Sequence, residues 1–278
     1  MNKKISVPGQ GAYPHISAER KAYLAGLKRK KLQVRICQIA ALVLFIAAWE
    51  VFARLGIIDS FIMSSPSRIM RTLANFRSNG LFMHVGITCF ETLVGFGLGA
   101  LLGNLIAFTL WWSPFLARVA APYLVVLNAL PKIALGPVII VWVGAGMQAI
   151  IVMALAISLV VTILEMLGGF TSTDKELVKM ARTFGASRWQ TFVKIIYPSN
   201  LHVLFGSLKI NIGLSLVGVI AGEFLVSRAG LGYLIIYGGQ VFQMDLVMTS
   251  VLLLGILAAL LYGGVALLEK KVMRAVQR

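Results

Sequence analysis

The chain has 278 residues, of which 59% are hydrophobic and 13% are charged, and its formal net charge at neutral pH is +16. Soluble domains carry about 25% charged residues, so this composition excludes a soluble globular domain and indicates an integral membrane protein. The positive charges cluster in loops between apolar runs, which argues against nucleic acid as the partner.

Six stretches of the chain are apolar and long enough to cross a bilayer, whose hydrocarbon core requires roughly 20 helical residues. They cover residues 36–53, 85–110, 119–141, 148–167, 201–226 and 246–268. The first run follows a long basic leader and lacks a clean cleavage site, so we interpret it as an uncleaved span. The sequence therefore predicts an all-α, polytopic membrane helix bundle with about six transmembrane helices.

The distribution of positive charge predicts the orientation of the chain. If the N-terminus lies inside, 19 Lys and Arg residues fall in inside segments and six in outside segments. Because cytoplasmic loops are enriched in Lys and Arg, we expect both termini in the cytoplasm. The predicted organisation is a basic N-terminal tail (1–35), a transmembrane domain (36–268) and a basic C-terminal tail (269–278).

The first outside loop contains the run SFIMSSPSRIMRTLANF. Pro66 is followed by apolar Ile69, Leu73 and Phe76 with arginines between them. This pattern predicts a short helix that lies on the membrane surface. The helix could be a simple connector or a docking surface.

The second span contains Gly95, Gly99 and Gly103 in the run TLVGFGLGALLGNLIAF. This small-xxx-small spacing lets helix backbones approach closely. We expect it to serve helix packing within the subunit, with dimerisation as the alternative.

The third span contains Pro122, Pro131 and Pro137. Each proline removes a backbone donor and disfavours a continuous helix. We therefore expect this span to be kinked, or re-entrant where protein rather than lipid covers the backbone.

The segment 173–198 separates the fourth and fifth spans and is long for a connector. Residues 173–176 form a capping box with Thr173 as the cap, and apolar residues then repeat at helical spacing as far as Phe184. Gly185 interrupts this helix, a second capping box at 187–190 opens another, and Pro198 closes it. The pattern predicts two short amphipathic helices, which could lie on anionic lipid, cap the bundle or dock on a soluble partner.

The run 179–198 resembles the EAA loop of ABC importer permeases. Ala181 stands at the second alanine of the motif, Gly185 at the loop glycine, Ile195 at the isoleucine and Pro198 at the closing proline. The spacing from Gly185 to Pro198 fits without a gap.

The resemblance covers about residues 65–268. The stretches NALPKIALGPVIIVWVGAG and VIAGEFLVSRAGLGYLI are similar to those of the nitrate, sulfonate and taurine class of permeases. Three residues depart from the loop motif: Lys179 replaces its Glu, Met180 its first alanine and Tyr197 its Leu. The lost carboxylate leaves the ion pairs at the partner surface undefined.

The resemblance implies that this loop forms coupling helices, which dock into a cleft of a cytoplasmic ATPase subunit. The implied docking positions are Ala181, Phe184, Gly185, Ala186, Trp189, Phe192, Ile195 and Pro198. It also implies an ATP-driven importer in a bacterial inner membrane, with two ATPase subunits that bind ATP and Mg²⁺, an extracytoplasmic solute-binding protein and a homodimeric permease.

No catalytic constellation accompanies these motifs, since the sequence has neither a GxxxxGK[ST] phosphate loop nor metal-ligand pairs. Cys37 and Cys89 lie in hydrophobic stretches, so we expect buried thiols and no disulfide. The sequence predicts a transport subunit, not an enzyme, with no cofactor or metal of its own. The alternative is a secondary transporter or channel working without an ATPase, although neither internal repeats nor several mid-membrane carboxylates are evident.

Polar residues inside a membrane are costly, so those within the spans are candidates for the substrate path. They are Glu91, Asn128, Lys132, Asn211 and Glu223. The alternative is that they pair within the protein. The resemblance implies a small polar solute, either a heterocyclic vitamin or pyrimidine precursor or a nitrate-, sulfonate- or taurine-like anion. Glu91 stands where many anion importers of this class carry Arg, which favours the heterocycles.

Overall fold

The computed structural model describes residues 18–75 and 80–276, and every regular element in this part of the chain is a helix. The described residues fall into two compact units that divide between Ser60 and Phe61. The all-α class predicted from the sequence is therefore confirmed.

The first unit contains one long helix, α1 (Ala18–Arg54), and its segment Arg29–Arg54 is apolar enough to span a membrane. The helix begins well before residue 36, because the Lys, Arg and Leu residues that precede the apolar run are good helix formers. Residues 1–17 of the predicted tail lie outside the described part of the chain. Cys37 is exposed on α1, so the expectation of a buried thiol is wrong there: nothing in a one-helix unit packs over it.

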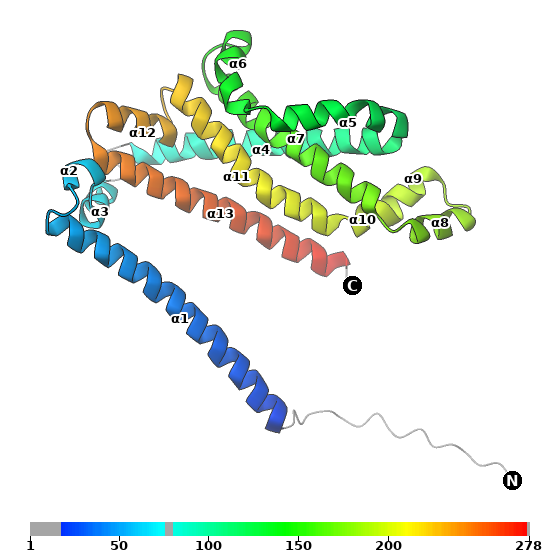
Figure 1. Ribbon diagram of the computed structural model, residues 1–278, viewed down its shortest axis with the longest axis horizontal. Helices are drawn as coiled ribbons and strands as arrows, with labels where there is room; N and C mark the ends of the chain where they lie inside the picture. The colour runs from blue at the N-terminus through cyan, green and yellow to red at the C-terminus, as the bar shows by residue number, and fades with distance from the viewer. Residues whose placement is uncertain (1–17, 76–79, 277–278) are drawn as a thin grey trace. The chain divides into compact units, whose positions relative to one another are not determined.

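The second unit holds the other long helices (Figure 1). These are α4 (Leu81–Trp112), α7 (Met147–Ser172), α11 (Leu201–Val226) and α13 (Met244–Val276). The shorter elements are α2 (Ser60–Met63) at the division, α3 (Pro66–Ala74), α5 (Pro114–Ala129), η1 (Lys132–Leu135), α6 (Gly136–Val143), α8 (Lys175–Thr183), α9 (Arg188–Thr191), η2 (Phe192–Ile196), α10 (Tyr197–Ser199) and α12 (Leu231–Gln240). Within this unit, α3 and α12 lie toward one end of the long helices and α8 to α10 toward the other.

Five helices among the described residues are long and apolar enough to cross a membrane, and the pair formed by α5 and η1–α6 adds a sixth if it is one broken span. The two parts of the pair are bent by 87°. The break falls at Leu130 and Pro131, whereas α5 continues through Pro122. The interruption predicted from the prolines is therefore confirmed.

Helix α7 packs between α4 and α11, and glycines allow both close approaches. A Cβ atom added to Gly95 of α4 would lie 2.6 Å from the Cβ atom of Ala154 on α7. One added to Gly218 of α11 would lie 2.6 Å from the Cα atom of the same alanine. Gly99 and Gly103 face α7 in the same way. The glycine stripe of the second span therefore packs within the subunit.

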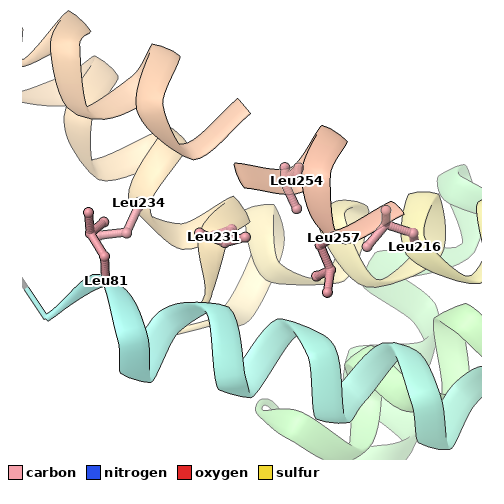
Figure 2. Close-up of a cluster of buried hydrophobic side chains, with 6 residues drawn as sticks. All are labelled: Leu81, Leu216, Leu231, Leu234, Leu254 and Leu257. Carbon is pink, nitrogen blue, oxygen red and sulfur yellow. The ribbon is translucent and has the colours of Figure 1, made fainter. Parts of the chain in front are cut away.

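A cluster of six leucines joins α4, α11, α12 and α13 (Figure 2). Its members are Leu81, Leu216, Leu231, Leu234, Leu254 and Leu257. Leu81 and Leu231 are completely buried. The cluster fixes the short helix α12 against the end of the bundle.

The short helix expected near residue 66 is present as α3, and the side chain of Ser65 caps it by accepting a hydrogen bond from the backbone nitrogen of Arg68. Arg68 also forms an ion pair with Asp245 at the start of α13, with an N–O distance of 2.9 Å. This pair attaches α3 to the bundle. Residues 76–79 of the expected segment lie outside the described part, and its location on the membrane surface stays a prediction.

The close packing of α4 on α7 predicts that Gly95 cannot be enlarged. We expect Gly95→Leu to destabilise the purified protein by about 1–3 kcal/mol, because the added side chain overlaps Ala154. The matched control is Gly97→Leu on the same helix, since Gly97 is exposed and a Cβ atom there meets nothing within 4 Å. Thermal unfolding in detergent measures the difference, and equal loss in both variants would contradict this packing.

Candidate functional site

The loop between α7 and α11 folds as predicted into two short helical segments, with one correction at its start. Helix α8 is capped by Asp174, whose Oδ1 accepts a hydrogen bond of 2.8 Å from the backbone nitrogen of Glu176. The predicted cap, Thr173, instead donates its hydroxyl to the carbonyl oxygen of Gly169. The helix therefore starts one residue later than expected, because Asp174 offers the stronger acceptor.

The elbow between the two segments is a glycine with left-handed backbone geometry. Gly185 has a φ of +79°, a conformation that costs other residues energy. Its nitrogen donates to the carbonyl oxygen of Arg182, and the nitrogen of Ala186 donates to that of Ala181, which completes a Schellman motif. The elbow predicted at Gly185 is therefore confirmed.

The second capping box is also confirmed. The backbone nitrogen of Gln190 donates to Oγ of Ser187 at 3.2 Å, and the backbone nitrogen of Ser187 donates to Oε1 of Gln190 at 2.8 Å. The reciprocal pair fixes the first turn of α9 directly after the elbow.

Pro198 does not close the second helix, contrary to the prediction. The helix widens to π geometry over η2, which precedes the proline, and continues through α10 as far as Ser199. In a π-helical turn, a backbone nitrogen pairs with a carbonyl one residue farther back than in an α-helix. The helix can therefore accommodate Pro198, which has no backbone N–H. The helix ends at Asn200.

One face of the loop is buried against the membrane bundle. Phe192 and Ile196 pack with Ala107 of α4 and with Met166 and Phe170 of α7. The ring of Phe192 lies with its centroid 4.7 Å from that of Phe108, 4.9 Å from that of Trp111 and 5.3 Å from that of Phe170. This aromatic cluster joins the loop to α4 and α7.

The outward surface of the loop presents large apolar side chains, of which Trp189 also contacts Phe108 edge-on at a ring-centroid distance of 6.0 Å. Phe184 is 84% exposed and Trp189 is 57% exposed. Leu177, Met180 and Val193 are also exposed. Of the predicted docking positions, Ala181 and Phe192 are therefore buried, Ala186, Ile195 and Pro198 are partly buried, and Phe184, Gly185 and Trp189 face outward. Their role in docking stays a prediction.

The side chain of Asn200 joins the two ends of this loop by hydrogen bonds, and we call this contact the Asn200 latch. Local sequence patterns did not predict it. Nδ2 of Asn200 donates to Oγ1 of Thr173 at 2.7 Å and to the carbonyl oxygen of Ile196 at 2.8 Å. The side chain is buried where α7 and α11 meet. An asparagine directly after a helix is the only local signal, and its partner 27 positions earlier has no local signature.

At the other end of the bundle, Glu223 forms a buried hydrogen-bond network. Thr88 of α4 donates its hydroxyl to Oε1 of Glu223 at 2.6 Å, and the backbone nitrogen of Gly232 donates to Oε2 at 2.5 Å. Thr88 in turn accepts a hydrogen bond of 2.8 Å from the backbone nitrogen of Leu231. The carboxylate thus satisfies donors at the N-terminus of α12, where negative charge is favourable.

Glu91 lies beside this network, and one of its carboxyl oxygens has no hydrogen-bond partner among the described residues. Its side chain is 1% exposed, and its carboxyl group neighbours that of Glu223. No donor among the described residues reaches its Oε2 atom. Glu91 also lines a pocket of about 730 Å³ formed with the α6–α7 turn and the segment after α11, which includes Arg228.

The other polar candidates lie elsewhere. Asn211 is fully buried on α11, where its Nδ2 donates to the carbonyl oxygen of Ser207 at 2.9 Å and no described residue pairs with its Oδ1. Lys132 donates to the backbone oxygen of Asn128 at the break after α5. The structure thus pairs Glu91 with Glu223 and Lys132 with Asn128. Assignment of these residues to a substrate path stays a prediction.

Comparison with known proteins adds a family match. The family model described as "Binding-protein-dependent transport system inner membrane component" matches residues 95–274. The riboflavin transport system permease protein RibX of Chloroflexus aurantiacus is 30% identical over 84% of this chain and 87% of its own length. The putative aliphatic sulfonates transport permease protein SsuC of Bacillus subtilis is 27% identical over 95% of each chain.

The fold also matches a solved structure. A chain from an inward-facing crystal form of the MetNI methionine ABC transporter superposes with a TM-score of 0.61. The alignment covers 71% of this chain and 96% of that chain, at 22% sequence identity. The likeness shows a shared fold.

The Asn200 latch predicts a measurable effect on the dynamics of the loop. We expect Asn200→Ala to speed amide hydrogen exchange within residues 175–196 by about tenfold, because two hydrogen bonds are lost at a buried position. The neighbouring exposed Ser199 provides the control, Ser199→Ala, which should leave exchange unchanged. Unchanged exchange in the Asn200 variant would show that the latch does not hold the loop.

Proposed function

Because the chain belongs to the ABC importer permeases of the binding-protein-dependent transport inner membrane component family, we propose that it imports a small polar solute with energy from ATP hydrolysis on partner subunits. The family match includes α7, α11, nearly all of α13 and the whole loop between α7 and α11. The proposed site of action is a bacterial inner membrane, with both termini in the cytoplasm.

The observation that carries this proposal is the outward apolar face of a rigidly held loop. Phe184 and Trp189 expose most of their surface on either side of the elbow at Gly185. Large apolar side chains in that position are the anchors that a cleft on a protein partner accepts. The proposed partner is the cytoplasmic ATPase subunit, which binds ATP and Mg²⁺.

The contacts of the loop suggest how motion passes into the membrane. The aromatic cluster around Phe192 joins the loop to α4 and α7, and Asn200 joins its two ends. Closure of a pair of ATPase subunits would therefore move the loop and the ends of these helices together. We propose that two copies of this chain form the permease and that a solute-binding protein delivers the solute from outside.

The pocket beside Glu91 supports a preference among the proposed solutes. A buried carboxyl oxygen that meets no donor among the described residues favours a solute that brings N–H or O–H groups. A heterocyclic vitamin or pyrimidine precursor meets this requirement better than a sulfonate or nitrate. The relative RibX is named for riboflavin, and the relative SsuC for aliphatic sulfonates.

Docking through the elbow predicts the effect of removing one anchor. We expect Phe184→Ala to weaken binding of the detergent-solubilised permease to its ATPase subunit by about thirtyfold, because an anchor side chain contributes about 2 kcal/mol. Phe115→Ala is the matched control, since Phe115 is 69% exposed at the start of α5 and outside the loop. Equal binding by both variants would contradict docking at this surface.

The solute preference predicts the behaviour of Glu91→Leu. We expect uptake of a heterocyclic solute to fall by about tenfold or more, because the carboxyl oxygen that would accept a hydrogen bond from the solute is removed. Binding of the ATPase subunit should not change, because Glu91 lies far along α4 from the loop. Two results would contradict the preference: undiminished uptake of a heterocycle by the variant, or uptake of a sulfonate but not of a heterocycle by the unmodified protein.

A further inference from the structure

A second pocket lies at the loop end of the bundle, on the side of α8 that faces the turn between α4 and α5. Its volume is about 630 Å³. Part of its wall is apolar, with Leu110, Leu167 and Phe170 from the ends of α4 and α7. The outward apolar face with Phe184 and Trp189 does not contribute to it.

The remainder of this wall is strongly positive. Five cationic side chains line the pocket: Arg118, Lys175, Lys179, Arg182 and Arg188. The three from α8 are spaced i, i+4 and i+7 and so share one helix face. No Asp or Glu residue lines the pocket.

These cations are not neutralised by carboxylates within the described part of the chain. The ion pairs among residues 18–75 and 80–276 join Arg54 to Glu50, Arg68 to Asp245 and Lys209 to Glu269. Arg118 and Arg188 donate only to backbone oxygens, those of Pro114 and Trp111. The nearest acids along the chain are Asp174, which caps α8, and Glu176, which does not line the pocket and forms no ion pair with the described residues. Five like charges around one cavity favour an anionic occupant.

Two tryptophans beside the pocket indicate the source of that anion. Helix α4 ends at Trp111 and Trp112, and tryptophan is characteristic of the membrane–water interface. The guanidinium carbon of Arg188 lies 5.5 and 5.0 Å from the centroids of these two rings. These tryptophans favour a position of the cationic wall near the lipid headgroups, and the apolar wall beside it offers a surface for the start of an acyl chain.

We propose that this pocket binds the phosphate group of an anionic phospholipid and that the bound headgroup ties α8 to the α4–α5 turn. The proposal rests on the cytoplasmic placement of the loop in the proposed function, because anionic lipid at a basic juxtamembrane pocket is characteristic of that side. It also gives Lys179 a role, since this lysine stands where the related loop motif has an acid and completes the positive face of α8.

The test compares lipids on the full-length protein in neutral detergent. Native mass spectrometry counts retained lipid after addition of dioleoylphosphatidylglycerol or, separately, dioleoylphosphatidylcholine. We expect selective retention of phosphatidylglycerol, and a loss of about thirtyfold in its affinity in the Lys179→Gln/Arg182→Gln variant, since two headgroup contacts are removed. The control is Lys194→Gln, an exposed cation of the same loop outside the pocket, which should keep the affinity of the unmodified protein.

Several results would overturn the proposal. Equal retention of both lipids would show that the protein does not recognise the headgroup charge. An equal loss of phosphatidylglycerol affinity in the Lys194 variant would show attraction by the net positive charge of the loop instead of binding at a defined site. Competition by millimolar inorganic phosphate as effective as that by the lipid would identify a soluble anion as the occupant. Exclusion of phosphatidylglycerol from the pocket when the ATPase subunit is bound would identify an acidic segment of that partner. The double variant should still bind the ATPase subunit, because Phe184 and Trp189 remain intact. Loss of lipid binding with ATPase binding retained would therefore concern this pocket and not the proposed function.

Discussion

The close packing of α7 between α4 and α11 is the contact on which the rest of the second unit depends. Helices in lipid satisfy their own backbone hydrogen bonds, so their association relies on van der Waals contact and on small residues that permit it. Gly95 of α4 and Gly218 of α11 both pack against the same residue, Ala154. Because α7 has no free space toward either neighbour at that level, the three helices are expected to move as one body.

The same three packed helices, α4, α7 and α11, connect the two ends of the bundle. At one end, the loop leaves α7 and enters α11, and Asn200 joins its ends while Phe192 packs against α4. At the other end, Glu223 of α11 binds Thr88 of α4 and the first turn of α12. In the proposed mechanism, a displacement of the loop would pass along helices whose far ends are also hydrogen-bonded together, beside the pocket that Glu91 lines.

Local patterns in the sequence predicted the features that depend on local physics. Apolar run length located the spans, and the Ser187 box and Gly185 located the elbow, because capping and left-handed geometry are decided by neighbouring residues. The cap at Thr173 and the end at Pro198 were predicted wrongly, since Asp174 is the stronger acceptor and a π-helical turn accommodates the proline. The Asn200 latch and the pocket lined by Lys179 join residues from several elements, so spacing along the chain could not reveal them.

The central claim is that solute movement through this chain is driven by an ATPase docked on the loop between α7 and α11. The most direct measurement is uptake of radiolabelled solute, supplied together with its solute-binding protein, into proteoliposomes that contain the purified permease, with or without its ATPase subunit and ATP. The account predicts accumulation only when the ATPase subunit, ATP and Mg²⁺ are all present, and its loss when the elbow at Gly185 is distorted by Gly185→Trp in a variant that still inserts. Uptake that persists without any ATPase subunit would contradict the account and identify a transporter or channel that works alone.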